Sequence, residues 1–554
     1  MTIKFEEEKQ KKELESLRRT EEEESVKLVS SKYGVPYINL TSIPINTDAL
    51  KIISEDESRS AYMAIIQKVG KKLQIAVKNP EKPETKAVIK RLADESYSVS
   101  LFLVSKRGLE KAWAFYQEIA PPQRALGGSI DVSSSLLEEF SKEAKTIDEI
   151  KERIEKLSTK ATTEVFEMII AGAVSLDASD VHLEAQEKST RLRYRLDGVL
   201  QDITEIKNDI YKLIVSRIKL VSELKLNIHD RPQDGRFTIK LGGTDVEVRV
   251  STLPGPYGEN TVLRILNPKT IGIKFEELGM QPWIVEIMSR ELEKPNGMIL
   301  TTGPTGSGKT TTLYAFLKKV HKPGVKIITL EDPIEYHLAG IEQTQVFAKK
   351  GYDFASGLRA ILRQDPDVIL VGEIRDLETA ETAIHASLTG HLVFSTLHTN
   401  NAAGTIPRLV DIGVKPGLMA PGINVAMGQR LVRKLCEKCK KEKTATKDEL
   451  NEIESKIKTL PQSIKKPDIK NLKIYAATGC DGCHKTGYKG RIGVYEIILI
   501  DEKLEKLIMK KEGPTETDMK EAAFSQGQIN MKQDAILKII AGITDIEEMR
   551  RVLG

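Results

Sequence analysis

The sequence predicts an α/β protein centred on a mostly parallel sheet with helices on both faces. Three observations lead to this prediction. Short apolar runs alternate with helical stretches between residues 269 and 435, as in parallel strands that are buried on both faces. A glycine-rich loop stands between one such run and the helix that follows it. Polar residues follow each apolar run, at the strand ends where open α/β sheets bind ligands.

The composition is that of a globular protein with several domains. Among the 554 residues, 40% are hydrophobic and 30% are charged, and a chain of this length exceeds one hydrophobic core. Lys and Arg number 84 against 80 Asp and Glu, a net charge of +4, which argues against a dedicated nucleic-acid binder.

The sequence also lacks a membrane signal. No apolar run reaches the roughly 18 residues of a transmembrane helix, and the charged N-terminus has no signal-peptide pattern. We therefore expect a cytoplasmic protein without a transmembrane segment, which reaches a membrane only through a partner.

The glycine-rich loop reads Gly-Pro-Thr-Gly-Ser-Gly-Lys-Thr over 303–310, an unbroken match to the phosphate-binding pattern GxxxxGK[ST]. Its setting fits, because the apolar residues 298–300 precede it as a strand and 311–317 follow as a helix. The glycines let backbone N–H groups surround phosphate oxygens, and the helix start adds its positive dipole end. Lys309 would neutralise the β and γ phosphates, and Thr310 would give a hydroxyl to Mg²⁺. The predicted nucleotide site comprises Gly303, Pro304, Thr305, Gly306, Ser307, Gly308, Lys309, Thr310 and Thr311.

Carboxylates follow the next apolar run, 325–330. Glu331, Asp332 and Glu335 fall within five positions at this strand end. A hydrolase needs a carboxylate beside the γ phosphate to orient or deprotonate the attacking water. Glu331 and Glu335 are therefore candidates for that role.

Two further strand ends carry polar side chains. Glu373 follows the run 368–371, where it would serve the Mg²⁺ shell directly or through water. His398 follows the run 391–395, where it would hydrogen-bond the γ phosphate and report its loss. Because every catalytic position holds a competent residue, the sequence favours an ATP hydrolase over a non-hydrolysing scaffold.

All cysteines belong to two Cys-x-x-Cys pairs, Cys436 with Cys439 and Cys480 with Cys483. In a reducing compartment such pairs predict a tetrahedral structural Zn²⁺ site. The second pair and His484 also match the haem-attachment pattern Cys-x-x-Cys-His. Haem attachment of that kind belongs to exported proteins and would leave the first pair unexplained, so zinc is preferred.

A module with strand-like alternation precedes the nucleotide region. Alternating runs cover 190–196, 245–251 and 261–266, and they place Arg249 and Arg264 on strands. We expect seven parts in all: a charged tail 1–24, a first α/β domain 25–120, a linker with a helix 121–159, a second N-terminal domain 160–268, an ATPase core 269–435, a cysteine module 436–483 and a helical region 484–554.

Together these features resemble the hexameric ATPases of bacterial type II secretion and type IV pilus assembly, over nearly the whole chain from about residue 25. The motifs that carry the resemblance lie at 178–182, 194–200, 231–236, 249–254, 303–310, 328–336, 362–376 and 390–400. The resemblance implies a RecA-like P-loop domain preceded by α/β domains of which the second is PAS-like, a zinc module and a helical C-terminus.

The resemblance also implies a function. Six chains would form a homohexamer that turns ATP hydrolysis into rotation of its domains, and an inner-membrane platform protein would use that motion to extrude pilins or pseudopilins. Glu335 would be the catalytic carboxylate, with Glu331 second. Arg249 and Arg264 match arginines that reach the triphosphate. Arginines 359 and 363 match interface residues.

The cysteine pairs and the first N-terminal domain favour an extrusion ATPase, because retraction ATPases that look similar in the core lack both. The long interval between Cys439 and Cys480 favours the pilus-assembly branch. A type II secretion ATPase is the alternative, and a nucleic-acid translocase with a similar core is a further one. No direct contact with nucleic acid is expected.

Overall fold

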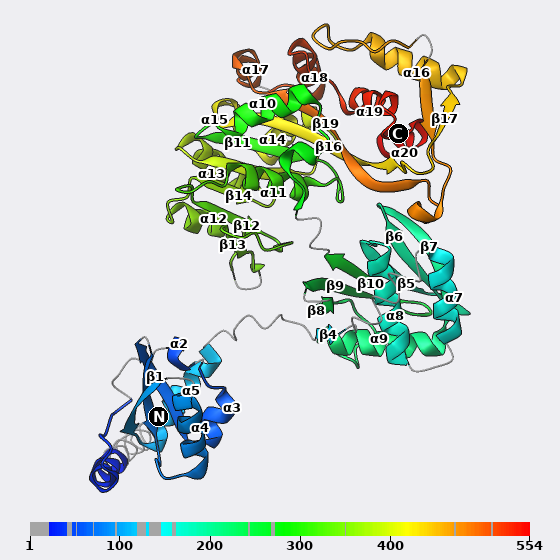
Figure 1. Cartoon of the computed structure of the whole chain (residues 1–554). Coiled ribbons are helices and arrows are strands. Elements are labelled where there is room, and N and C mark those ends of the chain that lie inside the picture. The colour runs from blue at the N-terminus through cyan, green and yellow to red at the C-terminus, as the bar shows by residue number, and fades with distance from the viewer. Residues whose placement is uncertain are drawn as a thin grey trace, which may run out of the picture. The chain divides into compact units, whose positions relative to one another are not determined.

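In the computed structural model, the chain forms two compact units, Met1–Leu126 and Gly127–Gly554 (Figure 1). The described residues are 21–40, 47–50, 52–69, 71–94, 97–118, 129–131, 146–157, 162–241, 244–266, 272–348, 351–469, 472–510 and 513–554. Most of the expected charged tail and the first part of the expected linker lie outside them. None of the described helices is long and apolar enough to cross a membrane.

The N-terminal unit is a small α/β structure. Its sheet has the order β1-β2-β3, with β1 antiparallel and β3 parallel to β2. The indole N–H of Trp113 donates to Ser58 Oγ at 3.0 Å inside the core. The elements are α2 (Thr47–Leu50), α3 (Glu55–Ser60), β1 (Met63–Val69), β2 (Lys72–Val77), α4 (Pro83–Asp94), β3 (Ser98–Leu103) and α5 (Lys106–Glu118).

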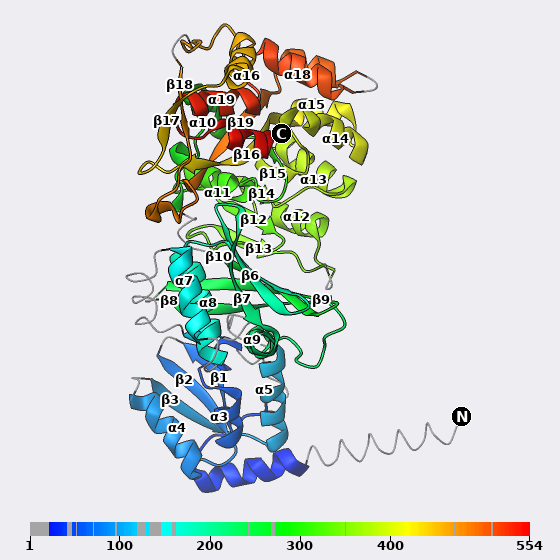
Figure 2. The same cartoon turned by 90° about the vertical axis from the view of Figure 1, so that its right-hand side faces the viewer.

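The second unit begins with a seven-stranded sheet of order β4-β8-β9-β10-β5-β6-β7. Three helices, α7, α8 and α9, contribute to the core that this sheet covers (Figure 2). Phe166 and Phe237 meet edge to face in this core, with ring centroids 6.1 Å apart. The elements are β4 (Ser129–Asp131), α7 (Ile147–Leu157), α8 (Thr162–Ser175), β5 (Asp180–Ala185), β6 (Ser189–Leu196), β7 (Val199–Lys207), α9 (Asn208–Val221), β8 (Gln233–Leu241), β9 (Thr244–Gly255) and β10 (Gly258–Leu266).

A second seven-stranded sheet follows, with the order β13-β12-β14-β15-β11-β16-β19. All neighbouring strands in it are parallel except β16 and β19. Its strands are β11 (Gly297–Thr302), β12 (Ile327–Glu331), β13 (Glu342–Gln345), β14 (Val368–Val371), β15 (Leu392–Leu397), β16 (Ile423–Leu435) and β19 (Tyr488–Leu499). The four expected strands of this region are present, and the predicted α/β fold is confirmed.

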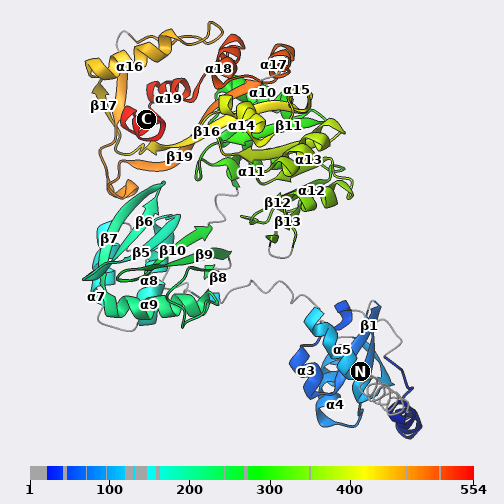
Figure 3. The same cartoon turned by 180° about the vertical axis from the view of Figure 1, so that it is seen from behind.

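Helices cover both faces of this sheet (Figures 1 and 3). One face packs against α10 and α11 around Phe316 and Phe394. The other face packs against α12, α13, α14 and α15 around Leu330 and Val393. The helices are α10 (Pro282–Leu292), α11 (Lys309–Val320), α12 (Phe354–Leu362), α13 (Leu377–Leu388), α14 (Thr405–Ile412) and α15 (Pro416–Gly422). Burial on both faces explains why the central strands read as continuous apolar runs.

Three strands of this sheet were not expected: β13, β16 and β19. The four residues of β13 are polar, so no apolar run marks that strand. β16 carries Gln429, Arg430 and Arg433 between its apolar residues, and its burial alternates toward its end, so it lacks a continuous apolar run. β19 returns to the sheet after the cysteine pairs, so the region expected to be helical begins with a strand. β19 is the last strand in the sheet order and pairs antiparallel with β16. A more polar sequence is tolerated in such an edge strand.

Helices α16, α19 and α20 pack around Ile453, Ile536 and Met549, whereas α17 and α18 bury Leu504, Ile508 and Met519 against the second seven-stranded sheet. Their first turns are capped by side chains such as Thr515 and Asn530, which accept backbone N–H groups. The elements are β17 (Lys441–Thr444), α16 (Lys447–Lys458), β18 (Lys473–Ala476), α17 (Glu502–Ile508), α18 (Glu516–Ser525), α19 (Met531–Ile540) and α20 (Ile546–Leu553). The expected helical C-terminus is therefore present from Glu502 onward.

Candidate nucleotide site and cysteine cluster

The phosphate loop joins β11 to α11 and depends on its glycines. Gly306 and Gly308 have φ of 79° and 90°, in the left-handed region that glycine tolerates best. At Gly303 a Cβ would lie 2.6 Å from Ser307 Oγ and 2.7 Å from the carbonyl oxygen of Gln429. A side chain at position 303 would therefore clash with its neighbours. Only glycine lets the backbone curve closely enough here to surround a phosphate.

The loop has groups ready for an anionic ligand. Helix α11 starts at Lys309 with no side-chain cap, which leaves first-turn N–H groups for phosphate oxygens. The Ser307 hydroxyl is buried and has no hydrogen-bond partner among the described residues. Lys309 Nζ donates to the carbonyls of Gly303 at 2.7 Å and Pro304 at 3.1 Å, and burial lowers the pKa of this ammonium group. These donors fit a triphosphate.

Glu331 is a buried structural carboxylate. It is 4% exposed and accepts hydrogen bonds from Tyr314 Oη at 2.5 Å, Thr329 Oγ1 at 2.6 Å and Gln343 Nε2 at 3.2 Å. Burial raises its pKa. Because protein donors occupy both of its oxygens, it is poorly placed to hold an attacking water.

Glu335 is arranged differently. Its carboxylate is 29% exposed and lies 3.1 Å from Arg249 Nη1. A second Arg249 nitrogen, Nη2, donates to the carbonyl oxygen of Ile334 at 2.8 Å. Arg249 lies on β9 of the preceding module, so the structure brings an arginine of one sheet to the carboxylate loop of the other.

The ends of β14 and β15 meet because these strands are neighbours in the sheet. His398 Nε2 lies 3.0 Å from Glu373 Oε2, and Arg375 forms an ion pair with the other oxygen of Glu373. The neighbour of β15 is β11, which leads into the phosphate loop. Glu373 and His398 thus stand at the strand ends beside the loop, as the sequence pattern predicts.

The other predicted arginines have different partners. Arg264 donates to Asp180 at 3.0 Å within its own module, and Arg195 contacts the second oxygen of Asp180 at 3.1 Å. Burial opposes ionisation of Asp180, but these contacts outweigh it and lower its pKa. The structure therefore does not bring Arg264 to the phosphate loop. Arg359 pairs with Glu378, and its carbonyl accepts from Arg363 at 2.9 Å.

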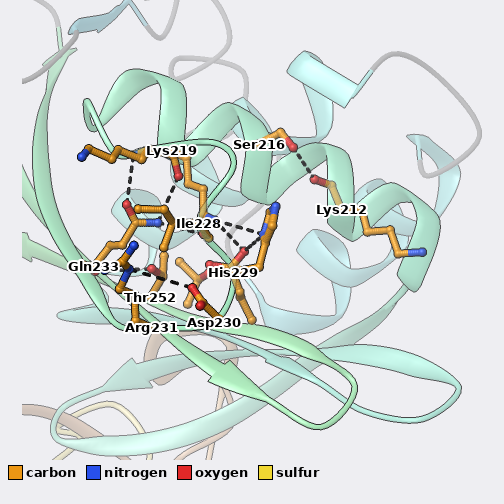
Figure 4. A network of polar contacts seen from close by, with 12 residues as sticks. Lys212, Ser216, Lys219, Ile228, His229, Asp230, Arg231, Gln233 and Thr252 are labelled. Atoms are coloured by element: carbon orange, nitrogen blue, oxygen red, sulfur yellow. Dashed lines mark hydrogen bonds and ion pairs between the residues drawn. The ribbon is translucent and has the colours of Figure 1, made fainter.

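A buried ion pair supports the strand that carries Arg249. Lys219 Nζ lies 2.7 Å from Glu259 Oε2, with side chains 1% and 6% exposed. Lys219 also donates to the carbonyl of Ile228 at 2.6 Å, and Gln233 Nε2 donates to the same oxygen at 3.0 Å (Figure 4). The loop after α9 is thereby fastened to β8 and β10, the two neighbours of β9. Removing one partner of such a pair would leave an uncompensated buried charge and destabilise this module.

The cysteine cluster forms as the spacing predicts. The four thiol sulfurs lie within 4.8 Å of one another. Three of the separations are 3.9 Å for Cys436 to Cys480, 3.7 Å for Cys439 to Cys483 and 3.8 Å for Cys480 to Cys483. A tetrahedral Zn²⁺ with Zn–S bonds of about 2.3 Å requires S···S edges of about 3.8 Å. These three separations match the edges of such a site, so the cluster is compatible with a Zn²⁺ ion.

Two residues near the loop were missed by sequence reasoning. Gln429 Nε2 donates to the carbonyl of Ser307 at 2.8 Å, and Arg430 Nη2 donates to the carbonyl of Asn400 at 2.7 Å. Both lie on β16, beside β11 in the sheet. Only a prediction that β16 pairs with β11 could have found them, because no short motif marks them.

A phosphate loop at the carboxyl end of a parallel sheet, with carboxylates and a histidine at neighbouring strand ends, defines a P-loop ATPase. Residues 155–551 match the family described as "Type II/IV secretion system protein", and the chain belongs to this family. It is thus an ATP-hydrolysing motor protein of the class that includes the secretion and pilus ATPases.

Curated relatives carry names from both branches of the family. The chain is 43% identical over 427 residues to the "Type II secretion system protein E" of Pseudomonas aeruginosa, covering 77% of this chain and 81% of the relative. It is 34% identical over 532 residues to the "Type IV pilus assembly ATPase PilB" of Myxococcus xanthus, covering 96% of this chain and 91% of that protein. The X-ray structure of the Legionella pneumophila ATPase DotB matches the fold with a TM-score of 0.51 at 21% identity, covering 71% of this chain and 96% of that one.

Proposed function

We propose that this chain is the motor of type IV pilus assembly, hydrolysing ATP as a homohexamer to drive pilin extrusion through an inner-membrane platform protein at the cytoplasmic face of the membrane. The match to the pilus ATPase supports this branch, because it extends over 96% of the chain, whereas the secretion relative of Pseudomonas aeruginosa matches 77% of it. Higher identity to the secretion relatives keeps type II secretion as the second candidate.

The contact between Arg249 and Glu335 carries the motor proposal. Arg249 comes from one module and Glu335 from the catalytic loop of the other, 3.1 Å apart. A triphosphate on the loop offers Arg249 a competing anionic partner, and transfer of Arg249 to it would free Glu335 for the attacking water. Movement between modules would then accompany each catalytic cycle.

The remaining roles follow from the site. Lys309 and the loop amides would hold the β and γ phosphates, and Thr310 with Glu373 would hold Mg²⁺. His398 would contact the γ phosphate from the adjoining strand end. Arg264 would reach the nucleotide only after leaving Asp180, so we propose it as a residue recruited by module closure.

If the chain is active only as a homohexamer, its ATP turnover should depend on protein concentration. ATP hydrolysis by the purified full-length chain should rise in specific activity with concentration as rings form, with Glu335→Gln as the inactive control. Constant specific activity, together with a monomer mass by light scattering at every concentration, would contradict the ring. Stimulation by single-stranded DNA would instead support the translocase alternative.

The branch is tested genetically. Deleting the gene in its host should abolish surface pili, and the wild-type gene should restore them while a Lys309→Ala allele should not. Loss of extracellular protein export with pili intact would assign the chain to type II secretion.

We further propose that the four cysteines hold one structural Zn²⁺. Cys436→Ser should lower bound zinc and should loosen the stretch 436–483, because four ligands in two separated pairs stabilise mainly the chain between them. Zinc content and limited proteolysis of the full chain measure both effects. We expect the affinity for ATP to stay within about twofold, since no cysteine contacts the phosphate loop. A zinc-free variant with unchanged proteolysis would contradict the structural role.

A further inference from the structure

Glu496, on β19, joins two segments that are distant in the sequence. Its Oε1 accepts the backbone N–H of Ala402 at 2.6 Å, and its Oε2 accepts the backbone N–H of Met531 at 3.2 Å. Ala402 opens the short helical turn η4 (Ala402–Gly404), four residues after His398, and Met531 is the first residue of α19. One side chain thus binds the segment after His398 to the C-terminal helices.

That segment is held by several elements. The Arg430 guanidinium on β16 donates to the carbonyl of Asn400 at 2.7 Å. Asn401 Nδ2 donates to Glu516 on α18 at 2.7 Å, and Thr302 Oγ1 on β11 donates to the carbonyl of Thr399 at 2.9 Å. These contacts fix the backbone on which His398 stands.

His398 itself is weakly enclosed. Its side chain is 53% exposed, and its imidazole meets Glu373 at 3.0 Å. Packing around the ring therefore contributes little to its position, which depends mainly on the backbone of residues 398–402. A shift of about 1 Å at a catalytic position can cost a factor of about 100 in rate.

The chemistry of the contact requires a carboxylate. Each oxygen of Glu496 accepts one backbone N–H, and hydrogen bonds to a charged acceptor are stronger than neutral ones. A glutamine offers one oxygen and one NH₂ group, and the NH₂ would face an N–H donor. Replacing Glu496 by Gln therefore breaks one of the two contacts while keeping the size of the side chain.

We propose that Glu496 is a positioning residue of the ATPase reaction, which sets the place of His398 at the γ phosphate by tying residues 398–402 to the start of α19. The inference rests on the proposed role of His398. It makes the start of α19, through the contact of Glu496 with Met531, part of the structure that positions His398.

Steady-state kinetics of full-length Glu496→Gln test the proposal. We expect kcat to fall by about 10- to 100-fold. The KM for ATP and the affinity for a fluorescent ATP analogue should stay within about twofold, because Lys309 and the loop amides are untouched. Hydrogen exchange at the amides of 398–402 should be faster than in the unsubstituted chain.

Asp534→Asn is the matched control. Asp534 accepts the backbone N–H of Tyr495 at 2.8 Å and pairs with Lys538 at 2.5 Å, so it also ties β19 to α19. It makes no contact with residues 398–402 among the hydrogen bonds of the described chain. Asp534→Asn should lower the free energy of unfolding at least as much as Glu496→Gln does, while leaving kcat nearly unchanged. Equal losses of kcat in both variants would overturn the proposal.

Glu516→Ala covers the case in which Glu496→Gln does not fold. Its side chain is 46% exposed, so its removal should leave the fold intact while freeing Asn401. We expect a smaller fall of kcat, about 3- to 10-fold, again without a change in KM. If Glu496→Gln does not fold, unchanged kcat in Glu516→Ala would overturn the proposal.

His398→Ala, assayed in parallel, separates this inference from the proposed function. An unsubstituted chain that hydrolyses ATP, with His398→Ala impaired and Glu496→Gln normal, would refute the positioning role alone. Normal turnover by His398→Ala would refute the role of His398 and the inference with it.

Discussion

Glu335→Gln is expected to bind ATP normally and to hydrolyse it at least about 100-fold more slowly than the unsubstituted chain. The carboxylate is partly exposed after a strand end, and among the described residues its ion-pair partner is Arg249. An amide of the same size retains the shape of the loop but neither attracts Arg249 nor accepts a proton from water. Binding is measured by titration with a fluorescent ATP analogue, and turnover by phosphate release.

Two controls give this result its meaning. Glu342→Gln changes an exposed glutamate on the neighbouring strand β13 and should leave turnover unchanged. Glu331→Gln should instead destabilise the fold, by about 1–3 kcal/mol, because it breaks a buried set of hydrogen bonds from Tyr314, Thr329 and Gln343. Full turnover by Glu335→Gln would refute the assignment of Glu335 as the catalytic carboxylate.

Lys309→Ala should weaken ATP binding by more than about 100-fold, which abolishes turnover at millimolar ATP. Without ligand the ammonium group donates to two loop carbonyls, and a bound triphosphate would replace these acceptors with charged oxygens. Each hydrogen bond between charged groups contributes about 1.5–3 kcal/mol, so losing two of them costs at least about 3 kcal/mol of binding free energy. Isothermal titration calorimetry with ATP and Mg²⁺ measures the loss.

Lys319→Ala is the matched control for this variant. Lys319 lies on the same helix, pairs with Glu276 at the surface and is far from the loop, so its removal should leave ATP affinity unchanged. ATP affinity in Lys309→Ala within a factor of three of the unsubstituted chain would contradict the phosphate-binding role of Lys309.

Local sequence patterns determined much of this protein. The phosphate loop is recognisable because its chemistry needs adjacent residues in fixed order, and the cysteine cluster because each pair forms one tight turn. The four central strands are recognisable because burial on both faces demands continuous apolar runs. For the same reason the carboxylates at 331–335, Glu373 and His398 could be placed at strand ends.

Only the tertiary structure decided which of these side chains meet. The strand-end pattern alone does not separate Glu331 from Glu335, and only the family resemblance ranked Glu335 first. In the structure, three buried donors surround Glu331, whereas an arginine from another module meets Glu335. Arg264 pairs with Asp180 rather than with the catalytic loop, and Glu496 contacts the segment after His398 from a strand that the sequence did not predict. Residue type and spacing specify the groups that one backbone turn brings together. Which side chains meet across strands depends instead on how the strands pair and how the helices pack on them, and this involves the whole chain.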